Sequence, residues 1–189
     1  MKPELSPYDP DGSISSFPTT SAPDASASTG KPLLTPRDGS RRGAALRLVR
    51  RCRFDAASLF AAWIEPALAG QWLFATATRP MVKTRIDARA GGQYCLAERR
   101  GVGIVEHRGQ YIDVVPPRRL AFTLSTPDLD GETLVCVDIG PRRAGCAVTL
   151  THAHLGTDEI MRARQRWLGV LYGLGETLDT AATRWQRNQ

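Results

Sequence analysis

The sequence predicts an α+β domain in which an antiparallel sheet of about six to seven strands is covered by one long C-terminal helix. Three observations support this prediction. Strand-like runs follow one another with short turns between them, which favours an antiparallel arrangement. Two short helical segments come directly after the first strand. The C-terminal segment carries apolar residues at every third or fourth position, as a helix that covers a sheet does.

The first elements are a strand and two short helices. Residues 44–54 alternate apolar and charged side chains, the pattern of a strand with one face in water. Asp55 can cap the next helix, because its carboxylate accepts free N–H groups of the first turn. Pro66 can start the second helix, since proline is favoured at the first helical position. The apolar stripe of the first helix comprises Leu59, Phe60, Trp63 and Ile64.

Six further strands and a closing helix are expected after these helices. Gly109 is expected to mark a bulge or a close approach of two backbones. Thr157 can cap the closing helix, and the apolar stripe predicts that this helix is the main cover of the sheet. The strands span residues 81–87, 91–98, 102–115, 119–125, 133–139 and 146–152, and the helical stripe comprises Ile160, Ala163, Trp167, Leu171, Leu174 and Leu178.

Composition separates a tail, residues 1–43, from a folded domain, residues 44–189. The first 40 residues hold seven of the 13 prolines and few large apolar side chains, so we expect the tail to be disordered. Leu59–Ile64 is the longest apolar run, and a membrane span needs about 20 residues, so no membrane association is expected. The N-terminus lacks the apolar stretch of a secretory signal, and the four cysteines form no C-x-x-C pair, which indicates free thiols in the cytoplasm.

The chain carries a formal charge of +6, and arginine doublets occur at several turns. Such doublets could attract anions or nucleic acid. No aromatic-and-basic recognition motif accompanies them, so we interpret them as a solvated surface and expect no nucleic-acid partner.

Several stretches resemble one superfamily. They are Phe54-Asp55-Ala56-Ala57 with Gln71-Trp72, Arg89-Ala90-Gly91-Gly92-Gln93-Tyr94, Gly109 to Thr123 with its Val-Val-Pro-Pro-Arg-Arg-Leu core, and Val148 to His152 followed by Arg166-Trp167-Leu168. The chain is similar in these to the SRPBCC (START-like) superfamily, in its branch resembling the activator of the heat-shock-protein-90 ATPase. The resemblance implies a bacterial protein with a helix-grip fold, in which a curved sheet is wrapped on the long C-terminal helix and leaves a cavity between them. Members bind or transform hydrophobic small molecules, and some are polyketide cyclases.

Strand parity indicates which side chains face that implied cavity, since successive side chains alternate between the two faces of a sheet. We assign the apolar sets to the helical side, with the polar or reactive groups that share their parity. The candidate cavity residues are Trp72, Tyr94, Leu96, Glu98, Phe122, Cys146, Val148, Leu150, His152, Trp167 and Leu171.

His152 and Glu98 are candidate catalytic residues, because histidine titrates near neutral pH and a carboxylate can orient it. In the alternative interpretation His152 bonds to backbone at a strand end and Glu98 reaches solvent; no spacing signature enforces the pair, and we favour this alternative. His152 and His154 are expected on one strand face and could begin a metal site, but catalytic zinc needs three ligands and a third is not apparent. We therefore expect no metal and no cofactor.

Three functions are open from the sequence. The leading hypothesis is a non-catalytic protein that binds a hydrophobic small molecule between sheet and helix. The second is an enzyme of cyclase, aromatase or hydrolase type that uses His152 and Glu98. The third is a co-activator that contacts a chaperone, and a homodimer is also open.

Overall fold

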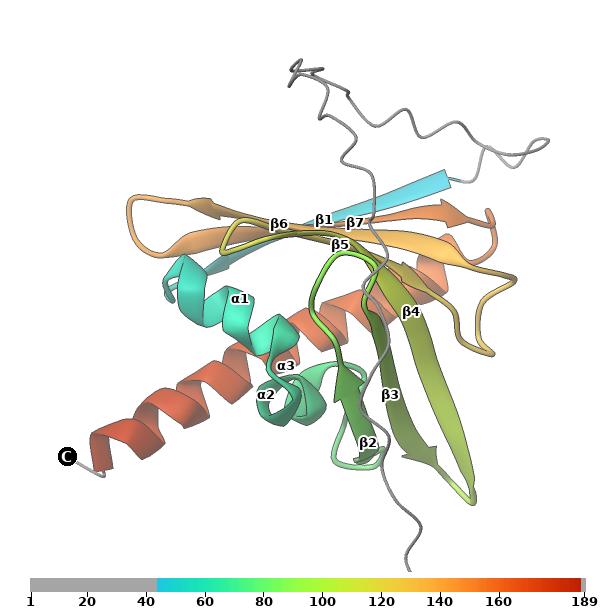
Figure 1. The fold of residues 1–189 in the computed structure, drawn as a ribbon, viewed down its shortest axis with the longest axis horizontal. Helices are drawn as coiled ribbons and strands as arrows, with labels where there is room; N and C mark the ends of the chain where they lie inside the picture. Colours follow the sequence, from blue (N-terminus) through green and yellow to red (C-terminus); the bar gives the residue numbers. More distant parts are fainter. Residues whose placement is uncertain (1–43, 188–189) are drawn as a thin grey trace, which may run out of the picture. The chain divides into compact units, whose positions relative to one another are not determined.

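The computed structural model describes residues 44–187 and has the element order that the sequence predicts (Figure 1). The segment 1–43, expected to be disordered, lies outside the described residues, as do residues 188 and 189. The elements are β1 (Ala44–Cys52), α1 (Ala56–Ile64), α2 (Pro66–Trp72), β2 (Met81–Ile86), β3 (Gln93–Arg100), β4 (Gly103–Val115), β5 (Arg119–Leu124), β6 (Thr133–Pro141), β7 (Cys146–Leu155) and α3 (Ile160–Arg187). The predicted α+β helix-grip fold is confirmed.

The described strands form a seven-stranded antiparallel sheet in the order β1-β7-β6-β5-β4-β3-β2. β4 is 13 residues long and pairs with β3 through its first part and with β5 through its second. Where it changes partner, Gly109 passes so close to β5 that a Cβ there would overlap the carbonyl oxygen of Thr123. The close approach expected at Gly109 is therefore confirmed, and the register shift lies just beyond it, between Tyr111 and Asp113.

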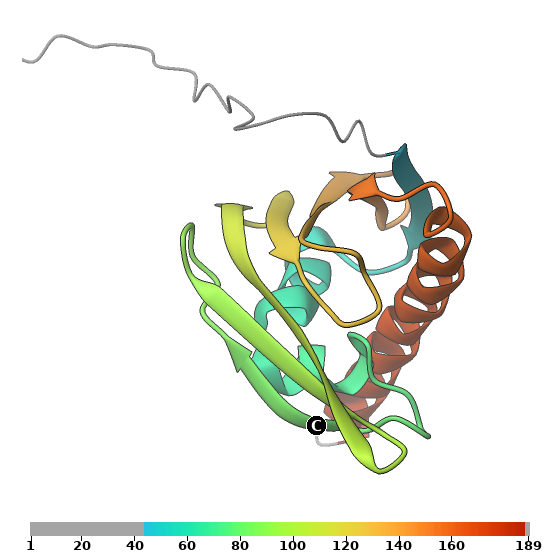
Figure 2. The same ribbon diagram turned by 90° about the vertical axis from the view of Figure 1, so that its right-hand side faces the viewer.

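The sheet bends around the helices, which lie on its inner, concave face (Figures 1 and 2). α3 contacts β1 and α2, and α1 contacts β6. The helical stripe expected on α3 is confirmed by its buried members, which are Ala163, Trp167, Leu171, Leu174 and Leu178. No helix of the described residues is both long enough and apolar enough to cross a membrane.

The helix starts follow the sequence in two cases out of three. Asp55 caps α1, where its Oδ1 accepts the backbone N–H of Ser58 at 2.8 Å, and Pro66 stands in the first turn of α2. The cap expected at Thr157 is wrong, because α3 begins at Ile160. The carboxylate of Glu159 instead accepts the backbone N–H of Gly156 at 2.6 Å, which holds residues 156–159 in a turn before the helix starts.

Gly169 weakens α3 without a packing role. A Cβ at this position would meet no atom within 4 Å, whereas a Cβ at Gly173 would lie 3.3 Å from the Cβ of Trp72. We expect Gly169→Ala to raise the free energy of unfolding by about 0.5–1 kcal/mol, because glycine in a helix interior is that much worse than alanine. Urea denaturation measures this change in the free energy of unfolding. Gly173→Ala is the control, because its new Cβ would be crowded by Trp72. Equal gains from both substitutions would contradict the packing of α3 on α2.

Candidate functional site

The concave interior is apolar and nearly filled. A small space remains beside β3, β4 and β5, with a volume of about 10 Å³, which is at the lower limit for one water molecule. Three tryptophans fill much of the neighbouring core, and Trp63 stands edge-on to Trp72 with 4.7 Å between ring centroids. The space is lined by Trp63, Leu73, Ile86, Tyr94, Leu96, Tyr111, Leu120 and Phe122.

All eleven predicted cavity residues are buried. Tyr94, Leu96 and Phe122 line the remaining space, and the other eight do not line it. Trp72, for example, donates its indole N–H to the carbonyl oxygen of Ala62 at 3.1 Å and joins α2 to α1. The sequence did not identify the other five residues that line the space, which are Trp63, Leu73, Ile86, Tyr111 and Leu120.

His152 is held between two side chains. The indole N–H of Trp167 donates to its Nδ1 at 2.9 Å, so the ring proton is on Nε2. Nε2 lies 2.8 Å from the hydroxyl oxygen of Thr133, which itself donates to the carbonyl oxygen of Leu124 at 3.0 Å. Both ring nitrogens are therefore occupied, by side chains rather than by the backbone partner that one interpretation of the sequence expected.

Glu98 lies beside a different histidine. Its Oε1 is 3.5 Å from Nε2 of His107, and both side chains are 1% exposed. Arg100 donates from Nε to the same oxygen at 3.2 Å. The expectation that Glu98 reaches solvent is wrong, because the strand pairing turns it inward with Leu96. The sequence contained a signal for His107. If the strands on either side of the turn at Gly101 pair as a hairpin, with Arg100 opposite Gly103, then His107 lies opposite Leu96.

A network of ion pairs lies near Glu98 and involves Arg100, Arg166 and Asp128. Arg100 reaches both carboxylate oxygens of Asp128 at 2.9 Å, and Arg166 of α3 reaches one of them at 3.1 Å. Glu98 and Asp128 carry two negative charges, and the two arginines carry two positive charges. This end of the interior is therefore polar but balanced in charge.

Several buried polar atoms have no hydrogen-bond partner among the described residues. In folded proteins about nine in ten such groups are paired, and an unpaired one costs about 1–3 kcal/mol. One of these atoms belongs to Trp63, which lines the apolar space, and three belong to Glu98 and His107. The unpartnered atoms are Trp63 Nε1, Glu98 Oε2, His107 Nδ1 and Nε2, and Thr126 Oγ1.

His152 and His154 do not share a strand face. His152 is 1% exposed, whereas His154 is exposed to solvent. His154 has φ 66, a left-handed conformation that breaks the alternation of side chains along β7. Residues 44–187 contain no group of three His, Cys, Asp or Glu side chains arranged to hold a metal ion.

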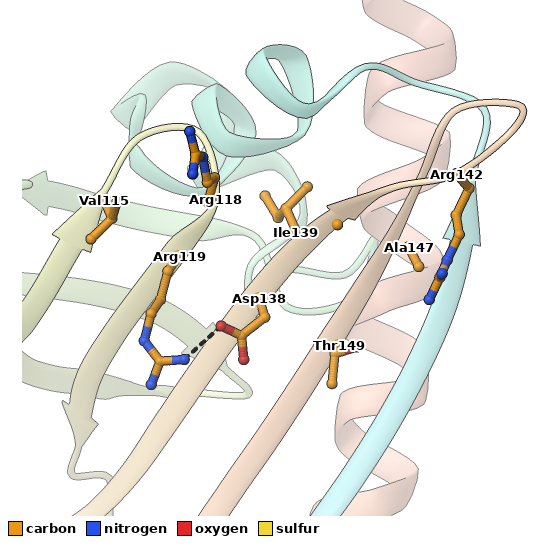
Figure 3. A pocket seen from close by; sticks show the side chains of 9 residues that line it. Val115, Arg118, Arg119, Asp138, Ile139, Arg142, Ala147 and Thr149 are labelled. Carbon is orange, nitrogen blue, oxygen red and sulfur yellow. Dashed lines mark hydrogen bonds and ion pairs between the residues drawn. The ribbon is translucent and has the colours of Figure 1, made fainter.

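A second hollow, of about 430 Å³, lies on the outer face of the sheet, opposite the helices (Figure 3). Arg119 and Asp138 form an ion pair there, with 2.6 Å between Nη1 and Oδ1. Arg118 and Arg142 come from two turns and stand at opposite margins. This hollow contains none of the predicted cavity residues. It is lined by Val115, Arg118, Arg119, Asp138, Ile139, Gly140, Arg142, Ala147 and Thr149.

The family model described as Activator of Hsp90 ATPase homolog 1-like protein matches residues 53–179, which run from the end of β1 into α3. The chain belongs to this family. Among curated proteins, none matches the sequence. Solved structures of other proteins share the fold of this chain, consistent with the SRPBCC resemblance.

Three of these structures show the extent of the likeness. A protein from Chromobacterium violaceum is 19% identical with a TM-score of 0.65, and the match covers 71% of this chain and 96% of that one. An AHSA1-like protein from Aeromonas hydrophila is 20% identical with a TM-score of 0.63, over 74% and 94%. A Staphylococcus aureus protein of unknown function is 13% identical with a TM-score of 0.68, over 75% and 96%. At these identities the likeness establishes the fold alone.

The two buried histidines make stability depend on pH. Burial lowers the pKa of His107 and of His152 to about 4 each, from about 6.5 in an unfolded chain. Between these values the unfolded state binds more protons than the folded state. The stabilisation that these two neutral histidines contribute should thus be complete above pH 6.5. The free energy of unfolding should fall as the pH drops from 6.5 toward 4.

Urea denaturation at a series of pH values measures this dependence. The variant His152→Gln removes one of the two groups and should reduce the slope in that window. A stability that stays flat from pH 7 to pH 4.5 would contradict the burial of neutral histidines in the fold.

Proposed function

We propose that this protein binds a small, mostly apolar molecule on the concave side of its sheet and catalyses no reaction on it. The proposed site lies beneath α1 and α2 instead of against the long helix α3, because Trp63 and Leu73 line the remaining space and no described residue of α3 does. The cytoplasm is the location we propose for it, which suits its four free thiols. One observation carries the proposal: the remaining space has an aromatic lining, and one member of that lining, Trp63, has a buried indole N–H without a hydrogen-bond partner among the described residues.

The lining has the composition of a ligand site. Such sites are mostly hydrophobic and aromatic, with a few polar groups that fix the orientation of the ligand. The aromatic members here are Trp63, Tyr94, Tyr111 and Phe122, and the unpartnered N–H of Trp63 supplies a polar group. The space of about 10 Å³ holds no organic molecule, so binding requires part of the wall to move.

The segment between α2 and β2 is the part of the wall best suited to move. Residues 76–80 are exposed. Thr76 and Arg79 exchange two backbone hydrogen bonds, and the carbonyl oxygen of Pro80 accepts the backbone N–H of Arg99 in β3 at 2.9 Å. Leu73 and Phe74, just before it, are buried against the interior. A displacement of this segment would open the space from the side of the edge strand β2.

The arrangement of His152 supports the proposal of a non-catalytic role. A general base must have a free nitrogen within reach of the proton it takes. Trp167 and Thr133 occupy both nitrogens of His152, and its pKa of about 4 makes it a weak base. Glu98 has Arg100 and His107 as its neighbours. The polar groups of the interior are thus suited to holding a ligand.

Thermal denaturation with a panel of apolar small molecules tests this proposal. A ligand at 100 times its Kd adds about 2.7 kcal/mol, which is roughly 5–10 °C in Tm for a domain of this size. Ile86→Phe, at the half-buried edge of the space, should abolish the shift, and Val115→Phe on the outer face should preserve it. A panel without any stabilising compound, or a shift that survives Ile86→Phe, would overturn the proposal.

A second candidate is contact with an Hsp90-type chaperone, taken from the description of the family. Met161, Leu168 and Tyr172 favour it, because they are 50–64% exposed and their spacing places them on one face of α3. Hsp90 ATPase activity should then rise with the wild type and not with Leu168→Ser/Tyr172→Ser. Equal ATPase rates with and without the wild type would eliminate this candidate.

A further inference from the structure

Two arginine doublets, Arg118-Arg119 and Arg142-Arg143, lie beside the hollow on the outer face of the sheet (Figure 3). They come together because β5 pairs with β6, so that the turn before β5 and the turn after β6 lie at the same end of the sheet. The backbone N–H of Ile139 donates to the carbonyl oxygen of Arg118 at 2.7 Å and joins the first turn to β6. Three of the four arginines line the hollow, and Arg143 does not.

The arginines of the lining differ in their partners. Arg119 is neutralised, because it forms ion pairs with Asp138 at 2.6 Å and with Asp113 at 3.3 Å. Arg118 and Arg142 form no ion pair with any carboxylate of residues 44–187. Their side chains stand at opposite margins of the hollow (Figure 3). The hollow therefore has two separated guanidinium groups without a counter-ion.

The floor between these two arginines has small side chains. In the pairing of β6 with β7, Gly140 lies opposite Ala147, and Asp138 lies opposite Thr149. A Cβ at Gly140 would meet no atom of the described residues within 4 Å. Glycine inside a strand often marks a bulge, or a place where a ligand or another backbone approaches closely. The register shows no shift at Gly140 and no backbone packs on it, which favours the approach of a ligand.

The lining indicates the chemistry of that ligand. A guanidinium group binds a carboxylate through two parallel hydrogen bonds, so two separated groups suit two carboxylates. Val115, Ile139 and Ala147 make the part between them apolar, as a short hydrocarbon chain requires. A single phosphate group is compact, and at one margin it would leave the other arginine without a counter-ion. The volume of about 430 Å³ lies in the usual range for small-molecule sites, about 300–1,000 Å³.

We propose that this outer hollow is a second ligand site and binds a small dicarboxylate, with one carboxylate on Arg118 and the other on Arg142. The chain of the ligand lies over Gly140 and Ala147. A ligand that crosses β6 from β5 to β7 spans about 10 Å, because neighbouring strands are about 4.8 Å apart. The interior space and this hollow lie on opposite faces of the sheet, so the inference does not depend on the proposed function.

Three probes of equal chain length test the inference on the full chain. Suberate carries a carboxylate at each end, octanoate carries one, and 1,8-octanediol carries none. In ¹H–¹⁵N NMR titrations at pH 7 and low ionic strength, the backbone signals of Gly140, Ala147 and Thr149 report on the hollow. Suberate should have at least a tenfold lower Kd than octanoate, which corresponds to about 1.4 kcal/mol. The diol should leave these signals unchanged.

Two results of the titrations would overturn the inference. One is an equal Kd for suberate and octanoate, because the second carboxylate would then have no partner. The other is a suberate titration in which the signals of Gly140, Ala147 and Thr149 do not shift, whether or not other signals do. Signals from the interior are separate, so an acid that binds there is not mistaken for a ligand of the hollow.

Four variants locate the effect. Arg118→Gln and Arg142→Gln should each raise the Kd of suberate to that of octanoate, because each removes one of the two counter-ions. Arg143→Gln is the matched control and should leave the Kd unchanged, since Arg143 is exposed in the same turn but does not line the hollow. Gly140→Val should abolish binding, because its side chain enters free space and fills the floor. Equal losses from Arg142→Gln and Arg143→Gln would indicate general attraction to a basic surface and contradict the inference.

Discussion

Replacing Gly109 by alanine should destabilise the domain by more than about 4 kcal/mol, a loss in the range of the most severe single substitutions. The new Cβ would overlap the carbonyl oxygen of Thr123 and lie 2.8 Å from Cε1 of Tyr94. The first obstacle is backbone, so no change of rotamer relieves it, and β4 would have to separate from β5. Urea denaturation followed by circular dichroism measures the loss.

Gly140→Ala is the matched control for this substitution. Gly140 lies in β6 of the same sheet, and a Cβ there would meet no atom within 4 Å. We expect a change within about 0.5 kcal/mol of wild type, as for an ordinary surface substitution. If Gly109→Ala were as stable as Gly140→Ala, the crossing of β4 from β3 to β5 would be misplaced.

Replacing Trp167 by alanine should cost about 3–5 kcal/mol for the lost indole. Trp167 is 1% exposed and contacts Phe74, Trp63 and His152. The substitution also leaves Nδ1 of His152 buried without its donor, which adds about 1–3 kcal/mol. The free energy of unfolding in urea, at pH 7, measures the sum.

The neighbouring residue supplies the control. Leu168 follows Trp167 on α3 but is 50% exposed, so Leu168→Ala should cost less than about 1 kcal/mol. Trp167→Phe should lie between the two, because it keeps a ring and loses the N–H group. A Trp167→Ala protein that is no less stable than Leu168→Ala would show that α3 does not pack on the sheet through this face.

Most of the fold follows from local patterns in the sequence. Alternation, the Asp55 cap, Pro66 and the α3 stripe each depend on residues close together in the chain, and each prediction was confirmed. The cap predicted at Thr157 was wrong, and Glu159 holds a turn there; its carboxylate also accepts the backbone N–H of Asp130, a contact 29 residues away. Such a contact leaves no trace in the local pattern.

The site was harder to predict because it depends on side chains from separate elements. The alternation of side chains along single strands correctly predicted that Tyr94, Leu96 and Phe122 face the interior. Parity alone could not bring Phe74 onto His107, since the left-handed backbone at Phe74 lies outside any strand or helix pattern. Parity also suggested that His152 is the neighbour of Glu98. The histidine beside Glu98 is instead His107, which the pairing of β3 with β4 places opposite Leu96.

Binding of a ligand in the interior is tested most directly by ¹H–¹⁵N NMR. The indole N–H signals are recorded while 2-naphthol, a small aromatic probe, is added. A ligand bound under α1 should shift the signal of Trp63, because the N–H of Trp63 has no hydrogen-bond partner among the described residues. It should also shift the signal of Trp167, which contacts Phe74. The signal of Trp72, tied to Ala62, should move least. Unchanged tryptophan signals at saturating probe, or backbone shifts confined to Gly140 and Arg142 on the outer face, would contradict the account.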